Sequence, residues 1–147
     1  MADRVSVSIT IGGDLAASAR DRFVATVAGE RLSVEWDGLP FDAAQLPERA
    51  ALRLYAHEVA WGRLDDLEAL CVALALPFVR WSGGYCSEWS PEILVFKGYG
   101  ETLVFVADEQ ERVVIDRATV AQLGTYAAVL AHFDAADFVV PPLRLIG

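Results

Sequence analysis

The side chains with the most chemical capacity alternate along one segment, residues 51–59. Arg53, Tyr55 and His57 occupy every second position there, and apolar residues stand between them. Alternate side chains of an extended strand point to opposite faces, so the guanidinium, phenol and imidazole share one face. Imidazole titrates nearest neutrality, which makes His57 the best single candidate for proton transfer. Glu35, on a neighbouring predicted strand, could orient the His57 ring if the strand register permits.

Further polar side chains join this face if neighbouring segments belong to the same sheet. Alternation over residues 5–11, 32–37 and 77–82 predicts three such strands. The shared polar face then comprises Ser8, Thr10, Glu35, Arg53, Tyr55, His57 and Arg80. Cations, an acid, an imidazole and hydroxyls together could form a general base or a pocket for a small anionic ligand. The alternative is a solvated sheet face, or one covered by later strands and satisfied by ion pairs.

A second cluster of candidate residues is aromatic. Residues 80–92, RWSGGYCSEWSPE, place Trp81, Tyr85 and Trp89 around the pair Gly83-Gly84. Paired glycines indicate a turn, because glycine tolerates the positive φ that tight turns require. Large aromatic residues at the edges of a turn either pack on the core or form a docking surface for a partner. An aromatic recognition loop is favoured over a catalytic one.

Signatures of catalysis, metal binding and nucleotide binding are weak in this sequence. Cys86 and His57 could in principle form a thiolate nucleophile, but the residues around Cys86 indicate neither a lowered thiol pKa nor an oxyanion hole. Two histidines and two cysteines without paired spacing do not predict a zinc site. Neither a dinucleotide fingerprint nor a Walker lysine is present. We therefore expect no cofactor and assign no catalytic residue.

Composition restricts the classes of partner. The 147 residues carry a formal net charge of −9 and no arginine cluster that would neutralise phosphates, so nucleic acid and anionic membranes are poor partners. Hydrophobic residues make up 54% of the chain and the mean hydropathy is +0.34. This is apolar for one domain spanning residues 1–147. A second buried surface, most simply a homo-oligomer interface, is therefore expected.

The elements that position these residues are predicted from periodicity. Strands over residues 5–11, 32–37, 51–59 and 77–82 alternate with helices over 15–28 and 64–76. This βαββαβ order predicts an α+β domain with a ferredoxin-like antiparallel sheet, whose helices cover one face. Short β-rich runs over residues 92–116 predict a C-terminal meander. Asp116 is a natural N-cap for a last helix over 117–133, and the tail 138–147 is expected to be extended.

Two hypotheses for function follow. The N-terminal residues alternate polar and apolar types, unlike a signal peptide, and the longest apolar runs are too short to span a bilayer. The first hypothesis is a small cytoplasmic protein-binding or regulatory module that self-associates and uses Trp81, Tyr85 and Trp89 or the apolar tail. The alternative is a small-molecule binding protein or enzyme, with a possibly anionic ligand on the polar face around His57.

Overall fold

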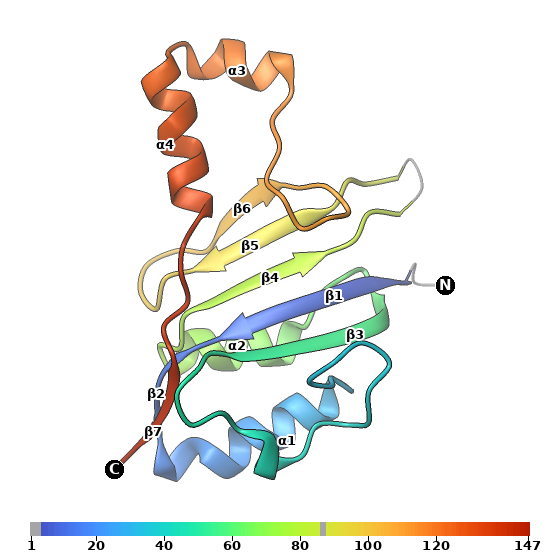
Figure 1. The fold of residues 1–147 in the computed structure, drawn as a ribbon, viewed down its shortest axis with the longest axis vertical. Coiled ribbons are helices and arrows are strands. Elements are labelled where there is room, and N and C mark those ends of the chain that lie inside the picture. Colours follow the sequence, from blue (N-terminus) through green and yellow to red (C-terminus); the bar gives the residue numbers. More distant parts are fainter. Residues whose placement is uncertain (1–3, 86–87) are drawn as a thin grey trace.

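Five strands form the main sheet of the protein (Figure 1), which we describe from a computed structural model covering residues 4–85 and 88–147. They are β1 (Arg4–Ile11), β3 (Leu52–Ala60), β4 (Phe78–Ser82), β5 (Glu92–Phe96) and β6 (Leu103–Val106). Their order is β3-β1-β4-β5-β6, and each strand is antiparallel to its neighbours. The described residues also form four α-helices, α1 (Arg20–Gly29), α2 (Asp65–Ala73), α3 (Arg117–Leu123) and α4 (Tyr126–Ala136). The fold class is therefore α+β.

The main hydrophobic core lies between one face of this sheet and helices α1 and α2. Alternation along β1 directs Ile9 to this side, where it is fully buried, and Leu54 lies opposite it on β3. Helix α1 contributes Phe23 and Val27, and α2 contributes Leu67 to the same cluster. In Figure 1 helix α2 lies behind the sheet. Strands β3 and β4 run parallel to each other on either side of β1, with α2 connecting them.

Residues 32–37 do not form the second strand that their alternation predicts. They make a single β-bridge, in which Ser33 exchanges two backbone hydrogen bonds with Tyr55. The chain then turns away, because Asp37 adopts a left-handed conformation with φ of 58° before Gly38. The βαββαβ order is therefore not found among the described residues, and β3 is the edge strand on this side of the sheet.

Strands β5 and β6 extend the main sheet instead of forming a separate one. They follow β4 as consecutive antiparallel neighbours. A second buried cluster lies on their outer face, opposite the face covered by α2, and contains Trp81, Ile93 and Phe105. Ala136 at the end of α4 closes this cluster. The sheet thus has two separate cores, one on each face.

The predicted last helix is divided into two. Asp116 is the N-cap of α3, as predicted, and its side chain accepts a hydrogen bond of 2.8 Å from the backbone N–H of Thr119. Helix α3 ends at Gly124, whose φ of 82° is left-handed. Thr125 then caps α4 by accepting a hydrogen bond from the backbone N–H of Ala128. A C-cap followed at once by an N-cap gives two helices that meet at an angle (Figure 1).

The C-terminal tail is extended, as predicted, and packs on its own domain. Strand β7 (Leu143–Ile146) pairs in parallel with β2 (Gly13–Ala16) in a two-stranded sheet. Gly12 allows this close approach, because a Cβ atom there would lie 1.7 Å from the carbonyl oxygen of Pro141. Among the described residues, no helix combines the length and the apolar character needed to cross a lipid bilayer.

Candidate functional site

The polar face of β3 forms on the side that the alternation predicts. Arg53 and Tyr55 lie directly opposite Thr10 and Ser8 of β1, and directly opposed residues of antiparallel strands point to the same face. The Arg53 guanidinium lies 5.4 Å from the centre of the Tyr55 ring, which is within the range of a cation–π contact. The fold therefore brings together one cation, one phenol and two hydroxyls.

His57 lies where a bulge shifts the register between β1 and β3. Its Nδ1 atom is 2.9 Å from the Ser6 hydroxyl, and its Nε2 atom is 3.2 Å from a carboxylate oxygen of Asp37. The ring of Trp36 stacks on the imidazole at 4.8 Å. The acid beside His57 is therefore Asp37. Glu35 is exposed, and its side chain has no hydrogen bond or ion pair within the described residues.

The Asp37-Gly38 pair is the sequence signal that could have located this acid. It marks the turn that returns the chain over β3 and places Asp37 next to His57. With a neutral ring, Nε2–H donates to Asp37 and Nδ1 accepts from the Ser6 hydroxyl. The side chains of His57 and Asp37 are 46% and 83% exposed, so water competes for every contact. The contacts of His57 with Ser6, Trp36 and Asp37 hold the segment around Trp36 on β3. They do not exclude water, as a closed active site does.

Arg80 does not share the polar face, so that expectation is wrong. It lies opposite Ile9 in the ladder between β1 and β4 and points to the side covered by helices. There its guanidinium is buried and contacts Glu92 at 2.8 Å and Glu68 of α2 at 3.4 Å. It also donates to the backbone carbonyl of Gly62. Arg80 is thus a structural residue of the main core.

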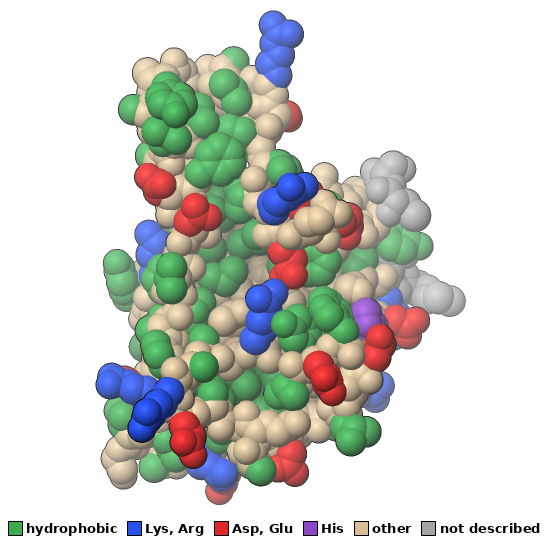
Figure 2. All heavy atoms as spheres, viewed as in Figure 1, with side chains coloured by type: hydrophobic (Ala, Val, Ile, Leu, Met, Phe, Trp, Pro, Cys, Tyr) green, Lys and Arg blue, Asp and Glu red, His purple; other side chains and the backbone are tan. Residues whose placement is uncertain are grey.

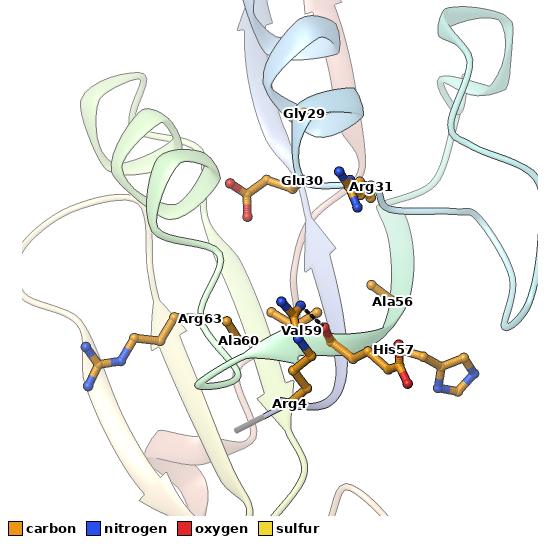
Figure 3. Close-up of a pocket in the computed structure, with 10 residues that line it drawn as sticks. Arg4, Gly29, Glu30, Arg31, Ala56, His57, Val59, Ala60 and Arg63 are labelled. Carbon is orange, nitrogen blue, oxygen red and sulfur yellow. Dashed lines mark hydrogen bonds between the residues drawn. The ribbon is translucent and has the colours of Figure 1, made fainter. Parts of the chain in front are cut away.

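A cavity of about 460 Å³ lies between the end of α1 and the bulge of β3 (Figure 3). Its charged lining residues include Arg4, Arg31, Arg63 and Glu30. Arg4 donates to the backbone carbonyl of Glu58 at 3.0 Å, and the ring of His57 points away from the cavity (Figure 3).

Both arginines and acids lie around this cavity. Burial raises the pKa of the Glu30 carboxyl, and repulsion from Asp66, Asp65 and Glu68 raises it further. The same acids would repel an anionic ligand. Arginines from three segments thus line this cavity together with Glu30 and Glu58, and the side chain of Arg63 points away from those of Arg4 and Arg31 (Figure 3).

A groove on the polar face is formed by two adjoining cavities of about 540 and 640 Å³. They share five lining residues: Val79, Ile93, Glu111, Phe138 and Val139. At one end, Arg53 donates to both carboxylate oxygens of Glu111, at 3.1 and 3.2 Å, and the Ser8 hydroxyl donates to one of them. The sequence predicted Arg53 and Ser8 on this face. Glu111 was missed, because it comes from a turn 58 residues later in the chain than Arg53.

The three aromatic residues of the glycine-containing loop have different environments. Trp81 is buried in the second core, and its indole N–H donates to the carbonyl of Asp108 at 2.9 Å. Tyr85 stacks on Trp89 at 5.2 Å, and Trp61 contacts Trp89 at 5.8 Å. Trp61 is 53% exposed. Of the predicted set, only Tyr85 and Trp89 lie on an aromatic surface patch.

Helices α3 and α4, residues 117–136, which we term the arm, are apolar and largely unpacked. The arm projects from the sheet, and hydrophobic side chains gather over it (Figures 1 and 2). Helix α3 has no buried residue, and α4 has only Ala136. Val120, Tyr126 and Leu130 are among the exposed large apolar residues of the chain. Sequence periodicity predicted an inner helical stripe here, but no element within residues 4–85 and 88–147 buries it.

Residues with metal-binding or thiol chemistry are placed as follows. No group of three or more His, Cys, Asp or Glu side chains within residues 4–85 and 88–147 is placed to hold a metal ion. Cys71 is in the main core, where burial raises the pKa of its thiol to about 12. Such a thiol is a poor nucleophile at neutral pH. Cys86, whose pairing with His57 the sequence allowed only in principle, lies outside the described residues.

Comparisons with known proteins match no family model, no curated protein and no solved structure.

Proposed function

We propose that the chain is a small cytoplasmic protein-binding module that self-associates, with the arm of a second copy covering its own arm. The carrying observation is the composition of α4, YAAVLAHFDAA, in which Asp134 is the sole acid and Lys and Arg are absent. A helix that is apolar around most of its circumference is normally buried. Among the described residues α4 fully buries only Ala136, so much of its apolar surface is available to a partner.

The distribution of charge favours a second copy as that partner. The arm contains one arginine, Arg117, and one acid, Asp134, whereas the chain carries a net charge of −9. Two acidic copies repel each other over most of their surface, and the repulsion is smallest where the surface is neutral. Association about a two-fold axis would bring the same patch together from both copies.

Strand β6 has apolar side chains on both of its faces, and one of them contacts the arm. Phe105 of β6 contacts His132 of α4 at a ring distance of 5.2 Å. Val104 and Val106 are 60% and 54% exposed on the opposite face of this outermost strand, and the carbonyl of Val106 accepts a hydrogen bond from the backbone N–H of Val114. An edge strand with exposed β-branched residues favours pairing with another chain. Tyr85 and Trp89 remain candidates for contact with a different protein partner.

Light scattering coupled to size-exclusion chromatography tests self-association. We expect wild-type protein to elute with the mass of two 16.0 kDa chains. Leu130→Asp places a charge in the arm, where Leu130 is 43% exposed, and should give a monomer. Leu39→Asp is the matched control, because Leu39 lies outside the arm and is 84% exposed. It should remain a dimer.

Two outcomes would contradict the proposal. A wild-type protein that is monomeric at several hundred micromolar would exclude self-association at concentrations where weak specific dimers form. A Leu130→Asp variant that stays dimeric, with unchanged circular dichroism, would place the interface elsewhere than the arm.

A further inference from the structure

The groove on the polar face combines an apolar body with a polar end. Val79 and Ile93 of the sheet line it from below, and Phe138 and Val139 line it from the segment that follows α4. The polar end contains Ser8, Thr10 and Arg53, together with Gln110 and Glu111 of the 108–112 turn. Apolar walls with a few convergent polar groups are typical of small-molecule sites, and a volume of about 540 Å³ is within their usual range.

The donors at the polar end already hold a carboxylate. Both oxygens of Glu111 accept from Arg53, at 3.1 and 3.2 Å, and one also accepts from Ser8, whose residue is only 4% exposed. A guanidinium with a buried hydroxyl is a donor set suited to a carboxylate. The chain fills that position with its own side chain.

The backbone at Glu111 has an uncommon conformation, and the turn around it is held in place by hydrogen bonds. Glu111 has a φ of 64°, a conformation that is uncommon for residues other than glycine. The turn is held by Asp108, whose side chain accepts from the backbone N–H groups of Gln110 and Arg112. Trp81 anchors the same turn to the sheet through the carbonyl of Asp108. Strain of this kind is retained where the surrounding structure imposes it, often at binding sites.

We propose that the groove binds a small monocarboxylate with an apolar chain, and that the Glu111 carboxylate occupies its polar end in the ligand-free protein. The ligand carboxylate would take the Arg53 and Ser8 donors, and its apolar chain would cover Val79, Ile93 and Phe138. This proposal does not rest on self-association, although Phe133 and Ala136 of the arm line the second cavity of the groove. Of the residues expected on the polar face, the site uses Ser8, Thr10 and Arg53.

Titration with octanoate, followed by ¹⁵N–¹H NMR, tests this site. Glu111→Gln removes the competing negative charge, so we expect octanoate to bind this variant about ten-fold more tightly than wild type. Shifts should concentrate on the amides of Ser8, Val79 and Phe138. Adding Arg53→Gln to Glu111→Gln should abolish the gain. Octanamide, which has the same chain without the charge, should bind wild type and Glu111→Gln weakly.

Controls separate this competition from general effects of charge and folding. Glu101→Gln removes an equal charge from an exposed residue outside the groove and should leave octanoate affinity at the wild-type value. Val139→Asp puts a charge on the apolar wall at a residue that is 85% exposed, so it should fold and bind octanoate more weakly. Equal affinity of Glu111→Gln and wild type, equal binding of octanamide and octanoate by Glu111→Gln, or an undiminished affinity in Val139→Asp would each overturn the proposal.

Discussion

Arg80 lies directly opposite Ile9 in the ladder between β1 and β4, so a guanidinium and an aliphatic side chain emerge on the same helix-covered face. The Arg80 side chain is 3% exposed. It is balanced by Glu92 at 2.8 Å and by Glu68 at 3.4 Å. A buried cation of this kind is tolerated only while its partners remain in place.

Removal of the Arg80 side chain should therefore destabilise the folded protein. Arg80→Ala leaves Glu68 and Glu92 without their buried cation, and we expect the free energy of unfolding to fall by about 3–5 kcal/mol. Urea denaturation followed by circular dichroism measures this change. Arg63→Ala, an exposed arginine on the β3–α2 connection, should change stability by less than about 0.5 kcal/mol. Equal effects of the two substitutions would show that the buried ion cluster has no special role.

The same cluster predicts a dependence of stability on pH. Burial raises the pKa of the Glu68 carboxyl above its ordinary value of 4.5, although Arg80 and the backbone N–H of Leu64 act to lower it. The folded protein therefore binds the Glu68 proton more tightly than the unfolded chain does. The stabilisation that comes from the more tightly bound Glu68 proton is present in full below pH 4.5. It is lost as the pH rises through the raised pKa of Glu68.

Glu68→Gln isolates that contribution. We expect the stability of wild type relative to Glu68→Gln to decrease as the pH rises above 4.5 and then to level off. Urea denaturation of both proteins from pH 4 to pH 8 measures the difference, in which the effects of acids that do not interact with Glu68 cancel. A difference that grows with pH would mean that the Arg80 charge, and not burial, governs Glu68.

Gly12 controls the docking of the C-terminal tail. A Cβ atom at this position would lie 1.7 Å from the Pro141 carbonyl oxygen, so Gly12→Ala should separate β7 from β2. We expect a loss of about 1–3 kcal/mol in the free energy of unfolding. Hydrogen exchange of the amides of residues 143–146 should also become faster.

Gly29→Ala is the matched control for that substitution. No atom lies within 4 Å of a Cβ built at Gly29, the last residue of α1. The change should stabilise the protein by about 0.4–1 kcal/mol and leave hydrogen exchange in β7 unchanged. Unchanged exchange in Gly12→Ala would mean that the tail tolerates a shifted path.

Periodicity along the chain was sufficient to predict several local features. The alternation of β1 and β3 correctly separated Ile9 and Leu54 from Ser8 and Arg53. Asp116 was correctly predicted as an N-cap, because its capping bond involves a residue only three positions away. The division of the last helix at Gly124 was missed, although glycine followed by threonine is a typical C-cap and N-cap pair.

The sequence by itself determined which residues share a face within each strand, because that depends only on the two-residue period of an extended chain. The tertiary structure decided how the faces of different strands align. In β4 both alternating sets contain an aromatic residue, Phe78 in one and Trp81 in the other, so hydrophobicity does not select the inner face. Pairing with β1 placed Arg80 in the core and Trp81 on the far side. Long-range packing likewise placed Asp37 beside His57 and Glu111 beside Arg53. The Asp37-Gly38 pair marks a turn, but no local pattern gives the partner of either acid.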